Sequence, residues 1–248
     1  MVARSAVRTQ ASGSAHVQVY TTAHRTGVTG ETVTLWGAGD IAYKPVQEHY
    51  DFRYSAPFAH ASGTAEAVLK DNILYQRWPE FSDRIPDGKA WIAQNMTRIG
   101  LALGINYGGI LNGASTSNPF QMLTFLRGTS QLQPVSHSVI DGVRTTSYSG
   151  EWDYTKLLRA HLITLEGLKL LRGQVSNPTP FRVWIDRRGL VRQLIWRREY
   201  LSDYDQPVTE ISRFRYSNFG EQVSVAAPAS WDVYDATGRT ITLSRIGS

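Results

Sequence analysis

The stretch that decides the fold is residues 180–192, PFRVWIDRRGLVR. Arg182 and Arg192 alternate with apolar neighbours, which is the pattern of a strand with one face in water. The pair Arg187-Arg188 lies in a turn between two such runs, residues 181–185 and 190–201. A third run follows at residues 208–219. Together they predict a three-stranded antiparallel meander.

A hairpin and two helices are expected just before this meander. Residues 132–140 and 143–152 flank Asp141-Gly142, a dipeptide typical of two-residue hairpin turns. Asn118 and Pro119 are favourable first residues for a helix over Phe120 to Leu126. Leucines at helical spacing predict a second helix from Tyr154 to Leu171, with Gly173 at its end.

The first half of the chain adds further strands. After a short helix over residues 2–10, alternating patterns predict strands at residues 15–23, 31–43, 48–54, 64–69, 73–78 and 89–93. Five glycines between residues 95 and 117 weaken any helix there by roughly 1 kcal/mol each relative to alanine. We therefore expect a frayed helix and then a mobile gate over Gly104 to Ser117. No repeat or linker interrupts the pattern, so residues 1–248 are expected to form one domain.

Composition favours a folded protein with a large aromatic content. The 248 residues include 12 Tyr, 8 Phe and 7 Trp, and 42% are apolar. The net charge of +5 is mildly basic, and several arginines lie close together near residues 182–198. Of these, Arg182 and Arg192 alternate with apolar residues, and Arg187 and Arg188 lie in a turn. A solvated sheet face explains them better than a nucleic-acid site, which usually gathers its charge on one face. An anionic head group or peripheral contact with a membrane surface is the alternative.

No catalytic or cofactor motif appears in the chain. There is no cysteine, the six histidines lack short ligand spacing, and neither a zinc-protease nor a serine-hydrolase motif is present. No metal and no cofactor are therefore expected. The weak candidates for acid–base chemistry are Glu48, His49 and Asp51, beside apolar residues of one strand. The alternative is that they face water or pair with Arg53 and similar residues.

The remaining candidates for a binding site are the large side chains on the predicted strands and on the helix over Phe120 to Leu126. A curved sheet would bring several of them to its concave side, although a register error of one residue reverses the face. The residues expected to line such a cavity are Trp36, Tyr43, Trp78, Trp91, Met122, Phe125, Tyr148, Trp152, Trp184 and Trp196.

The order of elements resembles the LppX/LprG-type lipoproteins of actinobacteria, relatives of the LolA/LolB lipoprotein carriers. Three motifs carry the resemblance: residues 183–186 followed by 189–192, the Asp141-Gly142 hairpin, and Asn218-Phe219-Gly220 before Val223. It implies a mainly β (α+β) fold, with a strongly curved antiparallel sheet, or half-barrel, and covering helices around an apolar cavity. It also implies a carrier of lipid or another large hydrophobic molecule, working without a cofactor.

The chain departs from that family at its N-terminus, which has neither a signal sequence nor a lipobox cysteine. As given it is expected in the cytoplasm, and in the cell envelope if it is a truncated form. Inside a cell the same cavity could hold a polyketide-like chain and close a ring by holding its reacting ends together. The lipid carrier and the cofactor-independent cyclase therefore both stay open.

Overall fold

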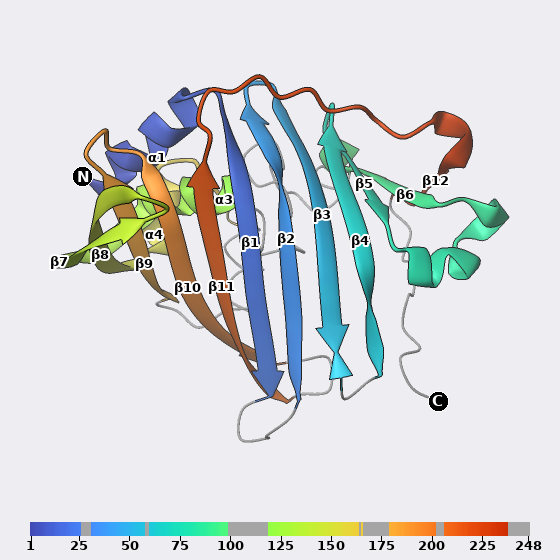
Figure 1. The fold of residues 1–248 in the computed structure, drawn as a ribbon, viewed down its shortest axis with the longest axis horizontal. Helices are drawn as coiled ribbons and strands as arrows, with labels where there is room; N and C mark the ends of the chain where they lie inside the picture. Colours follow the sequence, from blue (N-terminus) through green and yellow to red (C-terminus); the bar gives the residue numbers. More distant parts are fainter. Residues whose placement is uncertain are drawn as a thin grey trace.

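A computed structural model describes residues 1–25, 31–57, 60–98, 119–163, 165, 179–201 and 206–237 of the chain. Within this part, all the strands belong to one open twelve-stranded sheet, in the order β12-β6-β5-β4-β3-β2-β1-β11-β10-β9-β8-β7 (Figure 1). Their bounds are β1 Ser14–Arg25, β2 Thr32–Tyr43, β3 Val46–Ala56, β4 Ala61–Lys70, β5 Ile73–Arg77, β6 Trp91–Asn95, β7 Thr129–Ile140, β8 Val143–Trp152, β9 Thr179–Asp186, β10 Val191–Leu201, β11 Pro207–Ser217 and β12 Val233–Asp235.

Neighbouring strands are antiparallel except for β12, which runs parallel to β6. The meander predicted from residues 180–192 is β9, β10 and β11, and the Asp141-Gly142 turn joins β7 to β8. After β11 the chain runs along one edge of the sheet, past the ends of β1 to β4, and reaches β12 (Figure 1). The fold is mainly β with a strongly curved open sheet, as predicted.

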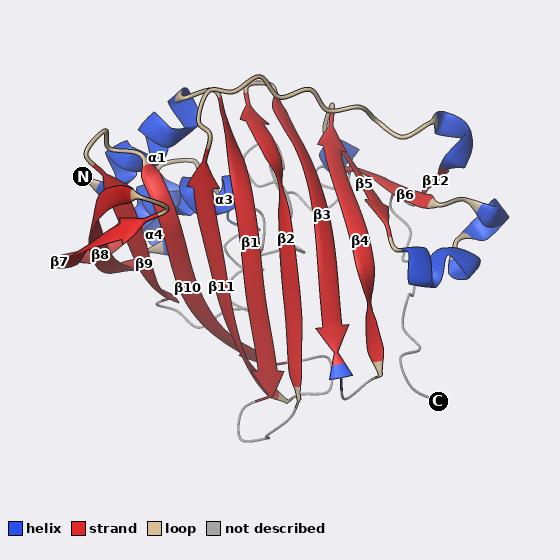
Figure 2. Cartoon of the chain, viewed as in Figure 1, coloured by secondary structure: helices blue, strands red, loops and turns tan. Residues whose placement is uncertain are grey.

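The α-helices α1, α3 and α4 are short and gather at one end of the sheet, while 3-10 turns lie at the other end, beside β6 and β12 (Figure 2). They are α1 Val2–Ala11, α3 Pro119–Phe125 and α4 Tyr154–Arg159, with 3-10 turns η2 Pro79–Arg84, η3 Pro86–Gly88, η4 Leu126–Gly128 and η5 Ser230–Asp232. Asp153 begins α4, because its Oδ1 accepts from Thr155 N at 3.0 Å and from Lys156 N at 3.1 Å.

The helix predicted over Tyr154 to Leu171 is wrong in its length. α4 ends at Arg159, because His161 takes a left-handed backbone conformation with φ 53° that a helix cannot continue. Residues 166–171 lie outside the described residues, as does the predicted gate from Gly104 to Ser117.

Strand alternation divides the sheet into an inner face, on which α1, α3 and α4 pack, and an opposite outer face. On β1 the inner residues Ala15, Val17 and Val19 are buried in the main core, together with Val2 of α1 and Leu123 of α3. Val191 N of β10 donates to Thr9 Oγ1 of α1 at 2.9 Å, which ties that helix to the sheet. One end of the inner face is therefore closed by the helices.

Glycine on the inner side of β2 lets β3 approach closely. A Cβ atom at Gly39 would lie 1.9 Å from His49 O and 2.5 Å from the Tyr50 ring, and one at Gly37 would lie 2.2 Å from the Phe52 ring. The two rings of β3 thus lie over bare backbone, where any side chain would separate the strands.

A register shift between Val191 and Gln193 bends β10 against β9, and further shifts occur on β7.

Candidate functional site

An aromatic cluster fills the inner face under α3. The Trp152 ring centroid lies 5.4 Å from that of Phe125, 5.2 Å from Trp196 and 5.7 Å from Phe181. Trp152 and Trp196 are buried, and within the described residues neither indole Nε1 has a hydrogen-bond partner. This end of the inner face is a solid apolar core.

A buried polar row crosses the inner face next to this cluster. Arg198 of β10 pairs with Glu210 of β11 at 2.7 Å, and the two side chains are 14% and 7% exposed. Glu210 also accepts from Ser212 Oγ at 3.2 Å, and Ser212 Oγ lies 2.9 Å from Thr21 Oγ1 of β1. Burying two charges costs several kcal/mol per ion unless their partners are well placed. The inner face therefore contains a specific polar point in apolar surroundings.

Glu48 of β3 forms a second polar point on the inner face. It is 4% exposed, and its charge adds to burial in raising the pKa of the Tyr43 and Tyr50 hydroxyls. Burial likewise raises the pKa of Tyr216, whose hydroxyl donates to Pro119 O at 3.0 Å. These three phenols therefore stay neutral beside Glu48 at physiological pH.

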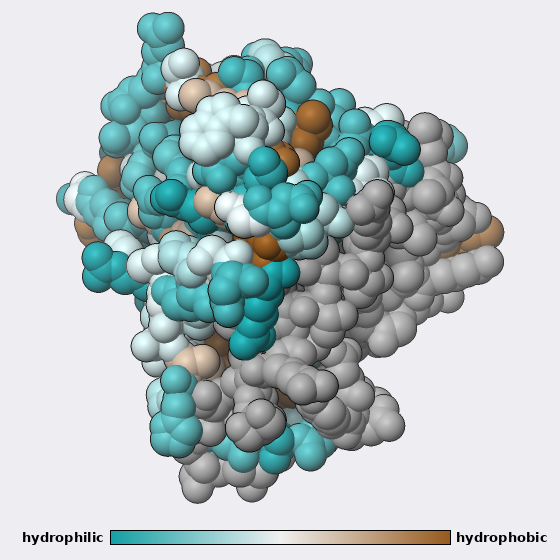
Figure 3. All heavy atoms as spheres, turned by 90° about the vertical axis from the view of Figure 1, so that its right-hand side faces the viewer, coloured by the Kyte–Doolittle hydropathy of each residue, from teal (hydrophilic) through white to brown (hydrophobic). Residues whose placement is uncertain are grey.

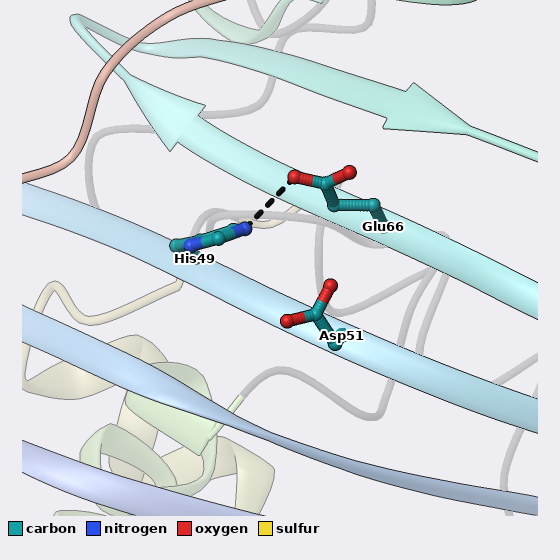
Figure 4. Close-up of side chains that lie close together, drawn as sticks. All are labelled: His49, Asp51 and Glu66. Carbon is teal, nitrogen blue, oxygen red and sulfur yellow. Dashed lines mark hydrogen bonds and ion pairs between the residues drawn. The ribbon is translucent and has the colours of Figure 1, made fainter.

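The three candidates for acid–base chemistry do not form one site. Strand alternation turns Glu48 inward, whereas His49 and Asp51 point to the outer face. On that face His49 Nε2 lies 2.9 Å from Glu66 Oε1 of β4, and Asp51 sits beside this pair (Figure 4). Within the part of the chain that the structure describes, these are the three side chains grouped closely enough to share a cation, with ligand atoms within 4.8 Å of one another.

Two of the three side chains of this outer cluster already have partners. Arg77 Nη2 donates to Glu66 Oε2 at 2.6 Å, while His49 Nε2 lies against the other carboxylate oxygen of Glu66. A zinc-like ion, which favours imidazole and carboxylate ligands, would have to displace both contacts. The sequence did not indicate Glu66 as a neighbour of His49 and Asp51, because the three residues meet only when β3 and β4 pair with Asp51 opposite Glu66.

The residues predicted to line a cavity fall on both faces. Tyr43, Tyr148, Trp152 and Trp196 are inner-face residues of their strands, and Met122 and Phe125 of α3 pack against that face. Trp78 packs on the inner residue Tyr54, with ring centroids 5.7 Å apart. Trp36, Trp91 and Trp184 lie on the outer face. There Trp36 is 49% exposed, and Trp91 packs with Val68 and Val225 in a small separate cluster.

Solved structures with this architecture include two mycobacterial proteins. The lipoprotein LppX of Mycobacterium tuberculosis matches 90% of this chain and 98% of its own, at 16% identity and a TM-score of 0.50. The chain has the LppX-type fold. LprF from Mycobacterium bovis matches 92% of this chain and 96% of its own, at 13% identity and a TM-score of 0.50.

At these identities the likeness establishes the LppX-type fold and leaves the ligand open. No protein-family model and no curated protein sequence matches the chain significantly. None of the described helices combines the length and the apolar character needed to span a lipid bilayer.

Proposed function

We propose that this protein binds and carries a large hydrophobic molecule, a lipid or a polyketide-like chain, against the inner face of its sheet. The observation that carries the proposal is a curved inner face that continues beyond the solid core under α3, with the rings of Tyr50 and Phe52 on β3 facing small residues of β4. The buried pair of Arg198 and Glu210 adds fixed polar groups to the same face. Ligand sites commonly combine apolar walls with a few fixed polar groups in this way. The likeness of fold to LppX and LprF supports a hydrophobic ligand.

Small side chains on β4 give the ligand room. The inner-face residues of that strand are Ala61, Gly63, Ala65, Ala67 and Leu69. Ala65 lies opposite Phe52 of β3, and Ala67 lies opposite Tyr50. A long chain lying beside these alanines would touch rings on one side and reach the polar row with its head group. The outer residues of the same strand, such as Thr64, would not meet it.

The test is to identify what the protein binds and where. Protein purified from its native host is extracted with organic solvent, and the extract is examined by mass spectrometry. The affinity for the extracted molecule is then measured for the parent and for two variants. Ala67→Phe places a ring on the inner face, and Thr64→Phe adds the same ring on the outer face. Both variants must keep the far-UV circular dichroism spectrum of the parent.

We expect Ala67→Phe to lose at least about tenfold of its affinity, since a ring would occupy part of the ligand volume, and Thr64→Phe to bind like the parent. Equal binding by both variants, or no extractable hydrophobic molecule together with no tryptophan fluorescence response to long-chain ligands, would reject the proposal.

A ring-closing catalyst is the second candidate, and the observation that favours it is Glu48 on the inner face among neutral phenols. A carboxylate there could move a proton while the surrounding wall holds the chain in a reactive shape. Incubation with linear polyene precursors of the native host should then give an isomer of equal mass, and Glu48→Gln should slow it by about 10²–10⁴-fold. Recovery of unchanged precursor would reject the cyclase and leave the carrier as the remaining proposal.

Cell fractionation tests the expected cytoplasmic location.

A further inference from the structure

Two grooves flank helix α1 at the end of the molecule where β7, β8 and β9 lie (Figure 1). The first, of about 740 Å³, lies between α1 and strands β7 to β9. The second, of about 760 Å³, lies between α1 and the region of η4 and α4. Arg8 and Gly189 line both grooves, so the two are neighbours on one continuous surface. We call this surface the α1 end.

The α1 end is strongly basic. Five exposed arginines line its grooves: Arg4, Arg8, Arg127, Arg144 and Arg187. Arg8 donates to the backbone carbonyl of Arg188 at 2.8 Å, and no described residue forms an ion pair with any of the five. Among the described residues that line the two grooves, the one acid is Asp186. Its carboxylate is taken by Arg192 Nε at 2.8 Å and Leu190 N at 2.9 Å, so it does not neutralise the surface.

Apolar side chains stand among these arginines. Val139 near the tip of the β7–β8 hairpin is 61% exposed and lines the first groove. Val7 of α1 is 48% exposed and lines the second. A branched aliphatic side chain gains nothing from pointing into water, but it gains free energy by entering a hydrocarbon layer. Positive charge with exposed aliphatic tips is the combination that binds an anionic lipid surface.

The opposite end of the molecule differs. Figure 3 shows the side of β5, β6 and η5, where the described surface is largely hydrophilic with apolar residues scattered singly. One exposed aromatic residue lies in η5, Trp231, which is 74% exposed. Single exposed apolar residues are normal on a protein surface. On the outer face, Arg53 and Arg213 are exposed and form no ion pair with a described residue, and they lie on either side of β1 and β2. These two arginines therefore serve as a matched control of equal charge.

We propose that the α1 end docks on an anionic lipid surface, with Arg4, Arg8, Arg127, Arg144 and Arg187 over the head groups and Val7 and Val139 at the hydrocarbon boundary. The proposal does not depend on the proposed function, because docking needs no molecule inside the protein. For a carrier, it would set the side from which a lipid is received or delivered.

The test is the partitioning of the full folded chain, freed of bound hydrophobic molecules by passage over a hydrophobic resin, onto vesicles of phosphatidylcholine with or without one-third phosphatidylglycerol. We expect binding to the anionic vesicles alone and its loss at high salt, which screens the charges. Arg144→Glu with Arg187→Glu should weaken partitioning by at least about 30-fold, because each basic residue near such a surface contributes about fivefold. Arg53→Glu with Arg213→Glu should leave it within about twofold of the parent, since these residues stay away from the membrane.

Val139→Asn should also weaken partitioning, at an unchanged net charge. All variants change exposed positions and are compared after their thermal unfolding midpoints have been shown to match the parent. Equal partitioning onto neutral vesicles, equal weakening by both arginine pairs, or tighter binding to a short single-stranded oligonucleotide than to anionic vesicles would overturn the proposal. Ligand extraction from the native host is a separate measurement, so failure of docking and failure of ligand binding are distinguishable.

Discussion

Replacing Glu210 by leucine should leave the guanidinium of Arg198 buried without its counter-charge. In the native pair, Arg198 and Glu210 are 2.7 Å apart, and their side chains are 14% and 7% exposed. The Arg198 guanidinium carbon also lies 4.5 Å from the ring centroid of Tyr200 and 5.5 Å from that of Trp196. Breaking such a pair on one side costs roughly 3–5 kcal/mol, because a desolvated charge remains. We therefore expect Glu210→Leu to lower the free energy of unfolding by about this amount.

Removing both charges should be far less costly than removing one. With Arg198→Met and Glu210→Leu together, no buried charge is left, and replacements of this kind are often neutral or stabilising. The free energy of unfolding is measured for the parent, both single variants and the double variant by urea denaturation followed by tryptophan fluorescence. The double-mutant cycle then isolates the energy of the pair.

Strand β10 offers a matched control. Arg197 and Glu199 are also an arginine–glutamate pair, joined at 2.6 Å, but their side chains are 56% and 57% exposed. The same cycle on this pair should give about 1 kcal/mol or less, since water already solvates both charges. If the inner and outer pairs gave equal coupling energies, or if Glu210→Leu cost under about 1 kcal/mol, burial would not be what distinguishes the inner pair.

Three further perturbations test the fold itself. Gly39→Ala should lower the free energy of unfolding by roughly 3 kcal/mol, because its Cβ would lie 1.9 Å from a backbone oxygen; Ala38→Ser on the outer face should be nearly neutral by urea denaturation. In an alkaline titration the unfolded chain ionises its tyrosines near pH 10 while buried ones stay protonated, so stability should fall as pH rises above about 10. Tyrosinate absorbance should therefore show a late step. Tyr154 should ionise near its pKa of about 12, whereas Tyr43, Tyr50 and Tyr216 should ionise only when the protein unfolds. Asp153→Ala should cost about 1 kcal/mol and Asp153→Asn much less, because asparagine still caps α4; equal losses would contradict the capping role.

The local parts of the fold were predictable because their determinants are local. The Asp141-Gly142 turn fixes the register of its own hairpin, and β8 spans residues 143–152, as its alternation indicated. Pro119 likewise marks the start of α3. Strand β12 was missed, since its three residues gain their order from pairing with β6, which is far away in the sequence.

The candidate site was predictable in kind but not in arrangement. Alternation separates Glu48 from His49 in any strand, yet which of them faces the helices depends on packing that no local pattern contains. The same uncertainty placed Trp36 and Trp91 with Trp152, although they lie on opposite faces. The Arg198–Glu210 pair requires the register of β10 on β11, which only the assembled sheet supplies.

The two edge strands have a consequence for how such a sheet survives at high concentration. An open sheet exposes unpaired N–H and C=O groups at each edge, and a second molecule could add its own strand there and propagate a fibre. Here β12 offers only three residues, and β7 carries register shifts around Gln133 and Pro134, where proline has no N–H to donate. The ends of the sheet are thus poor templates for growth. A smoother β7, for example through Pro134→Thr, would expose the molecule to edge-to-edge aggregation without altering its interior.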